Sequence, residues 1–199
     1  EQKKATRNGE ETTIEVMAEE AGGSREFWMF VGALVLLFSS VLITLATSLP
    51  VWNKVVQAFW PDYLGAALGD QVSHHNRYQL WIAVFIGLLT GIAQWLRYGE
   101  RNWKGWTRKF SFHIGVAVVG AGLLTALNLT WIEAHAWQFY ILLFSAMFAF
   151  VANADYIVAV IKGNLKLAGS AISHLGFGIL ILGVLGTGLN KRWISSNTF

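Results

Sequence analysis

The stretch Leu167–Leu189 reads LAGSAISHLGFGILILGVLGTGL and decides how the rest of the chain is interpreted. About 20 apolar residues, each rising about 1.5 Å, match the thickness of the hydrocarbon core of a bilayer. The stretch therefore predicts a membrane-spanning helix. One ionisable side chain, His174, lies inside it. Because an unpaired polar ring is unfavourable in lipid, we expect His174 to face other helices, a cavity or a bound group.

The composition places the whole chain in a bilayer. Of its 199 residues, 54% are hydrophobic, and they come in blocks too long for the interior of a small soluble domain. The sequence has no cysteine, which excludes disulfides and cysteine-based zinc, haem-attachment or redox sites within it. The net charge is only +3, and the basic residues lie beside the apolar blocks, so we expect lipid and no nucleic acid as a partner.

The apolar blocks predict an all-α, polytopic transmembrane bundle of five helices over residues 26–190. The spans are expected at about 27–49, 78–96, 110–129, 137–161 and 167–189. The first is expected to end before Pro50, because the residue preceding a proline disfavours helical geometry. Residues 51–77 then form a loop outside the membrane, with aromatic residues suited to the interface.

The two sides of the predicted bundle differ in charge. Eleven of the 15 basic residues fall on one side, in residues 1–25, 97–109 and 162–166. Short loops rich in Lys and Arg stay cytoplasmic, so we expect a bacterial inner-membrane protein with a cytoplasmic N-terminus and a periplasmic C-terminus. Residues 1–25 are interpreted as a solvated tail or loop, with a short helix at Ile14–Glu20 as the alternative. Residues 191–199 are expected to begin a truncated periplasmic segment of a larger protein.

Two faces are expected on the last span. Gly169, Gly176 and Gly183 recur every seven residues, which predicts a stripe that packs against a neighbouring helix. His174 lies on another face, together with small residues that leave room for a flat ligand such as a porphyrin: Ser170, Ala171 and Gly178. A hydrogen bond from His174 to another helix explains the residue equally well.

Other polar residues of the spans have simpler interpretations. His113 is expected at the interface, where it reaches headgroups or water. Asp155 is expected to pair with Lys162 or Lys166, and together with Asn153 and His174 it could instead form the polar path of a transporter or the contacts of a scaffold.

Histidines are also expected in the loops. His74 and His75 are placed in the outer loop, where a solvated position outweighs a metal or a porphyrin edge because no third ligand stands at a fixed spacing. Glu133 and His135 are explained by a wet turn. The sequence has no phosphate-binding loop, nucleophile elbow or zinc-protease motif, so the common soluble hydrolases are excluded.

Several short motifs share their order with a known family. Ser24-Arg25-Glu26 opens a span that closes with Thr47-Ser48-Leu49-Pro50, Asn76 precedes the second span, and Ala171-Ile172-Ser173-His174-Leu175-Gly176 lies in the last. With Ile194-Ser195-Ser196-Asn197, these resemble the C-terminal membrane half of the CcmF/NrfE family of cytochrome c maturation proteins, the haem lyase component.

The resemblance implies a role for His174 as one of two axial ligands of a transmembrane b-type haem. The second histidine and the family's tryptophan-rich catalytic motif are not in this sequence. The resemblance further implies apocytochrome c and other maturation subunits as partners. The expected function is therefore that of a haem lyase component that binds one cofactor and lacks the catalytic half. The role of His74 and His75 stays open, as does that of any catalytic residue.

Overall fold

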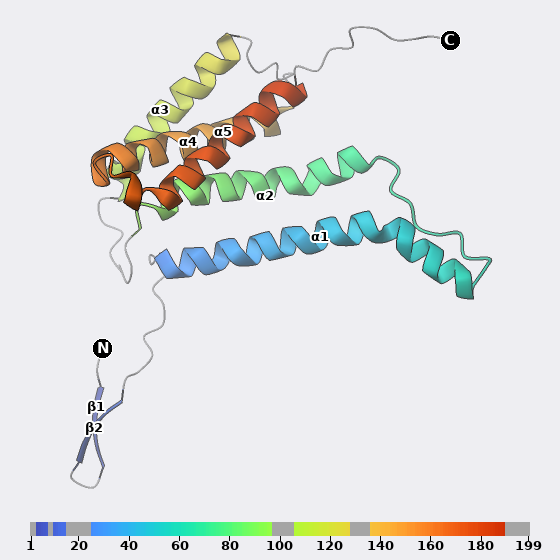
Figure 1. Ribbon diagram of the computed structural model, residues 1–199, viewed down its shortest axis with the longest axis horizontal. Helices are drawn as coiled ribbons and strands as arrows, with labels where there is room; N and C mark the ends of the chain where they lie inside the picture. The colour runs from blue at the N-terminus through green and yellow to red at the C-terminus, as the bar shows by residue number, and fades with distance from the viewer. Residues whose placement is uncertain (1–2, 8–9, 15–24, 97–105, 128–135, 190–199) are drawn as a thin grey trace.

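The computed structural model describes residues 3–7, 10–14, 25–96, 106–127 and 136–189. Its α-helices are α1 (Arg25–Phe59), α2 (Gln71–Ala93), α3 (Trp106–Ala126), α4 (Trp137–Asp155) and α5 (Gly169–Leu189) (Figure 1). A π-helical turn, η1 (Tyr156–Val160), continues α4, and a short 3-10 helix, η2 (Leu165–Leu167), precedes α5. The prediction of a helical bundle is thereby confirmed for the described part of residues 25–189.

Three of these segments are long and apolar enough to cross a membrane: Arg25–Phe59, Trp137–Val160 and Gly169–Gly188. Phe110–Ala126 in α3 is apolar but shorter. A membrane bundle is thus supported by length and composition, whereas the count of five spans stays a prediction.

α1 does not end before Pro50 as expected but continues through it to Phe59. A proline inside a helix removes one backbone hydrogen bond. Beyond the proline, the side chain of Asn53 binds the returning chain: its Nδ2 donates to the carbonyl of Ala66 at 2.6 Å and its Oδ1 accepts from the amide of Ala66 at 3.0 Å. Gln57 also donates to the carbonyl of Tyr63 at 3.1 Å. The returning chain is thereby tied to the last turns of α1, and the connection to α2 is shorter than the predicted loop 51–77.

The N-terminal segment contains a hairpin that the interpretation as a tail or loop lacked. β1 (Lys3–Arg7) and β2 (Glu10–Ile14) pair antiparallel, from Lys3 with Ile14 to Arg7 with Glu10. The sequence signal is Asn8-Gly9, the dipeptide typical of a two-residue hairpin connection between strands. Most of the alternative helix Ile14–Glu20 lies outside the described residues.

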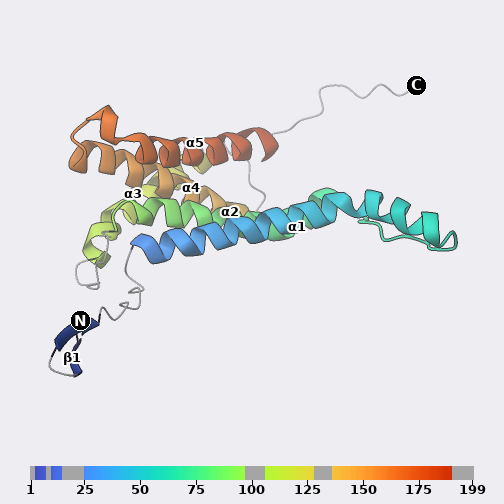
Figure 2. The same ribbon diagram turned by 60° about the horizontal axis from the view of Figure 1, so that its bottom comes forward.

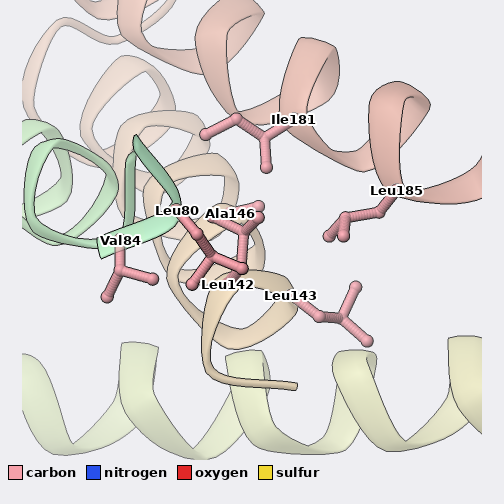
Figure 3. Packing of buried hydrophobic residues seen from close by; sticks show 7 residues of the cluster. All are labelled: Leu80, Val84, Leu142, Leu143, Ala146, Ile181 and Leu185. Carbon is pink, nitrogen blue, oxygen red and sulfur yellow. The ribbon is translucent and has the colours of Figure 1, made fainter. Parts of the chain in front are cut away.

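α4 is the central helix of the bundle. It packs against α2, α3 and α5, while α1 packs against α2 at the edge (Figures 1 and 2). Figure 3 shows the main apolar cluster, in which residues of α2, α4 and α5 meet: Leu80, Val84, Leu142, Leu143, Ala146, Ile181 and Leu185. Leu143 and Ala146 are fully buried there. The bundle is therefore organised around α4 rather than around α5.

Small residues allow α2 to approach α4 closely. Gly87 and Gly91 form a Gly-x-x-x-Gly pair, and a Cβ atom at Gly87 would lie 3.0 Å from Oγ of Ser145. A Cβ atom at Gly91 would lie 2.6 Å from the Phe148 ring and 3.5 Å from Cα of Ala149. Because lipid is as apolar as leucine, such close packing is what holds membrane helices together.

Candidate functional site

His174 is held by a hydrogen bond from another helix. It lies in the second turn of α5 and is half-buried. Its ring atom Nδ1 is 2.9 Å from Nε2 of Gln94, which follows the last turn of α2. No described residue hydrogen-bonds to the other ring nitrogen, Nε2. The guanidinium of Arg25, at the start of α1, lies within electrostatic range of the ring.

Gln94 is itself fixed from two sides. Only 3% of it is exposed, and its Oε1 accepts a 3.4 Å hydrogen bond from Oγ of Ser170, one turn before His174 on α5. The next residue, Trp95, donates from Nε1 to the carbonyl of Ala152 on α4 at 3.1 Å. The end of α2 is thus tied to both α4 and α5, which positions the amide against the imidazole.

The face of α5 that carries His174 is its packing face. Ala171 is fully buried and Leu185 nearly so. A Cβ atom at Gly178 would lie 3.0 Å from the carbonyl oxygen of Ala146 and 3.1 Å from the amide nitrogen of Phe150 on α4. The expectation that small residues leave room here for a flat ligand is therefore wrong at Gly178, because α4 fills that space, and Ala171 is fully buried as well, whereas Ser170 is exposed.

The predicted glycine stripe does not pack against a described helix. A Cβ atom at Gly169, Gly176 or Gly183 would have no described atom within 4 Å. The seven-residue spacing was a real feature of α5, but the spacing alone could not show which of two such rows faces α4. Ala171, Gly178 and Leu185 have the same spacing and form the contact.

His113 and Asp155 form a pair that sequence reasoning missed. Nε2 of His113 on α3 is 2.9 Å from Oδ2 of Asp155 at the end of α4. His113 is only 2% exposed and packs against the Trp95 ring at 5.0 Å between centroids. The expectation that His113 reaches headgroups or water is therefore wrong, because the ring is buried between helices, and Asp155 is bound to His113 rather than to Lys162 or Lys166.

Asn153 has a structural position. It is fully buried in α4, and its Nδ2 donates to the carbonyl of Thr90 on α2 at 3.2 Å and to that of Ala149 at 2.8 Å. Its Oδ1 has no hydrogen-bond partner among the described residues. The residue therefore contributes a contact between α2 and α4.

His74 and His75 lie in the first turns of α2 and not in a loop. They line a cavity of about 150 Å³ with Leu42 of α1 and with Tyr78 and Gln79. Adjacent residues of a helix point about 100° apart, so the two imidazoles do not converge on one metal. They also lie at the opposite end of α2 from Gln94, and hence far along the bundle from His174. Glu133 and His135 lie outside the described residues.

No group of three or more His, Cys, Asp or Glu residues among the described ranges is arranged to hold a metal ion. No protein-family model, curated protein or solved structure matches this chain. The resemblance to the CcmF/NrfE family thus stays a prediction.

The residues around His174 fit one axial position of a haem only in part. A neutral imidazole is a good iron ligand, but a metal-bound histidine donates its other ring N–H to an acceptor, whereas Nδ1 of His174 faces the amide nitrogen of Gln94, which is itself a donor. The described residues do not supply the second position. His113 is engaged by Asp155, and His74 and His75 lie at the other end of α2. Sequence reasoning also missed Gln94, although a polar amide inside an apolar run was an available signal.

Proposed function

We propose that this chain is the membrane part of a cytochrome c-type biogenesis protein, a CcmF-like haem lyase subunit. In this proposal His174 is one axial ligand of a transmembrane b-type haem, and the second ligand comes from outside residues 1–199. The observation that carries it is the state of the His174 ring. One nitrogen is held from α2, and the other has no partner among the described residues.

Charge near the ring supports the same proposal. Arg25 lies within electrostatic range of His174, so the site carries a positive charge near the ring. Bound haem would supply an iron centre that changes oxidation state. The chain's own contribution is to hold an imidazole at a fixed place and to keep its surroundings apolar. The proposal implies apocytochrome c and other maturation subunits as partners. The reaction that the protein would assist is the covalent attachment of haem to apocytochrome c in the periplasm.

The proposed orientation follows from charge at the two ends of the bundle. Gln94 and Asp155, which bind His174 and His113, lie at the end where the chain carries the basic residues 97–109 and 162–166. With the rule that basic loops stay cytoplasmic, this charge distribution supports a position of His174 toward the cytoplasmic side of a bacterial inner membrane. The five-span topology belongs to this proposal as well.

A second candidate is a scaffold without haem. Three polar contacts between helices favour it: Gln94 with His174, His113 with Asp155, and Asn153 with the carbonyl of Thr90. Each joins two helices, as polar residues do in many membrane bundles. These contacts form separate pairs rather than one continuous chain, so they favour a scaffold over a transport path.

An absorption spectrum tests the proposal. The natural protein should be purified as wild type and as His174→Ala, with His75→Ala as the matched control at the other end of α2. We expect a Soret band in the wild type and in His75→Ala, and its loss in His174→Ala, because an axial ligand is removed. A wild type without a Soret band, or a band unaffected by His174→Ala, would contradict the proposal and leave the scaffold.

A further inference from the structure

We propose that the cavity between the start of α2 and the start of α4 binds the head group of a zwitterionic phospholipid, of the phosphatidylethanolamine class. The cavity has a volume of about 490 Å³, which is in the range of small-molecule sites. It lies at the opposite end of α2 from Gln94 and His174, so the inference goes beyond the proposed function and does not depend on a haem.

The cavity joins polar side chains to apolar ones. Asp70, Ser73 and Arg77 line it from the start of α2, and Gln138 lines it from the start of α4. The next turn of α2 adds an apolar wall, Leu80 and Trp81. This mixture suits a ligand with a charged head and an apolar body.

The cavity also lies where α2 changes from polar to apolar. Residues 70–77 are mostly polar, whereas residues 80–93 contain no charged side chain. Trp81 contacts Trp137 of α4 with 5.7 Å between the ring centroids, and both rings are exposed. Exposed tryptophan rings at such a boundary are typical of the membrane–water interface. The cavity is therefore at the depth of lipid head groups.

Two opposite charges line the cavity. The exposed side chain of Arg77 has no hydrogen bond or ion pair with any described residue, so its guanidinium is available to a phosphate. Asp70 lies seven residues earlier, and its Oδ1 accepts from the amide of Ser73 at 3.2 Å, which caps α2. That hydrogen bond holds a carboxylate at the edge of the cavity. The site thus offers one cationic and one anionic group.

This pair of charges selects among phospholipids. The head group of phosphatidylethanolamine carries a phosphate for Arg77 and an ammonium with three N–H donors for Asp70. Phosphatidylglycerol has a phosphate but no cation, so Asp70 would repel it. Phosphatidylcholine has a cation without N–H donors, and it cannot hydrogen-bond to the carboxylate.

Native mass spectrometry of the natural protein in detergent tests the site, with the three lipids titrated separately at identical acyl chains. We expect Arg77→Gln to weaken the binding of all three about tenfold, because a hydrogen bond to a charged group is lost. Lys54→Gln is the matched control, since Lys54 is an exposed basic residue of α1 at the same end of the bundle and does not line the cavity (Figure 1). Equal effects of Arg77→Gln and Lys54→Gln would overturn the inference.

The second variant, Asp70→Asn, tests the choice of head group. Asparagine caps helices as well as aspartate does, so the fold is retained while the charge is removed. We expect the wild type to bind phosphatidylethanolamine about two- to fivefold more tightly than the other two lipids, and Asp70→Asn to lose this preference. Tighter binding of phosphatidylglycerol by the wild type, or an unchanged preference in Asp70→Asn, would overturn the assignment of a zwitterionic head group.

Discussion

α1 and α4 are both apolar enough to cross a membrane, yet they occupy different places in the bundle. The most apolar stretch of α1 is more apolar than that of α4, but only 11% of it is buried, against 44% in α4 and its π-helical continuation. Leu37 and Phe38 of α1 are largely exposed, whereas Leu143 and Ala146 of α4 are fully buried. Hydropathy thus fails to rank these helices by burial, because a leucine is about as stable in lipid as in protein.

Small and polar residues distinguish the two helices instead. α4 contains Ser145, Ala149 and Asn153 on buried surfaces, and two of these meet the Gly-x-x-x-Gly pair of α2. The two buried residues of α1 are also small, namely Gly32 and Ser39. Both of them contact only one helix, α2, among the described elements. In this bundle the number of small-residue faces indicates how many helices a helix contacts. Three predictions test that comparison.

Truncating a leucine should have very different effects on the two helices. Leu143→Ala in α4 should lower the free energy of unfolding by about 2–5 kcal/mol, because it leaves a cavity in the central cluster. Leu37→Ala in α1 should change it by less than about 0.5 kcal/mol, since lipid or detergent takes the vacated place. Unfolding of the purified protein in detergent by SDS titration measures both. Equal losses would contradict the placement of α1 at the edge.

The groove between α4 and α5 should reject a side chain at one glycine and accept it at another. Gly178→Leu should destabilise the protein by about 1–3 kcal/mol, because the new Cβ would lie 3.0 Å from a carbonyl of α4. Gly176→Leu, two residues away, has open space and should be neutral or stabilising by up to about 1 kcal/mol through helix propensity. Thermal unfolding of the two variants and the wild type in the same detergent measures these changes in stability. A loss confined to Gly176→Leu would restore the glycine stripe as the packing face.

The sequence was enough to predict which segments are helical and apolar, because that depends on composition within each segment. It also singled out His174, and it offered a hydrogen bond to another helix as one explanation, which the structure shows. It could not choose between two rows of small residues on α5, since the choice depends on where α4 lies. The Gly-x-x-x-Gly pair of α2 and the Asn8-Gly9 dipeptide are the sequence signals of the α2–α4 contact and of the N-terminal hairpin.

Contacts between residues that are far apart in the sequence could not be predicted from patterns within short segments. Gln94 precedes His174 by 80 positions, and His113 precedes Asp155 by 42. Lys162 and Lys166 were expected beside Asp155 because they are near in sequence. The left-handed backbone at Lys162 and Gly163 instead turns the chain sharply after η1. The contact of Asn53 with Ala66 likewise joins α1 to a segment 13 residues further along the chain.

The smallest expected free-energy change concerns the hydrogen-bonded pair of His113 and Asp155 at the end of α4. A double-mutant cycle of His113→Leu with Asp155→Leu should give a coupling of about 1 kcal/mol, the range of polar contacts between membrane helices. The value should stay low because 35% of the Asp155 side chain is exposed and solvent screens it. The matched cycle of Lys162→Met with Asp155→Leu should give less than about 0.3 kcal/mol. A larger coupling of Asp155 to Lys162 than to His113 would contradict this prediction. It would mean that Asp155 pairs mainly with the basic segment after α4 and that it does not link α3 to α4.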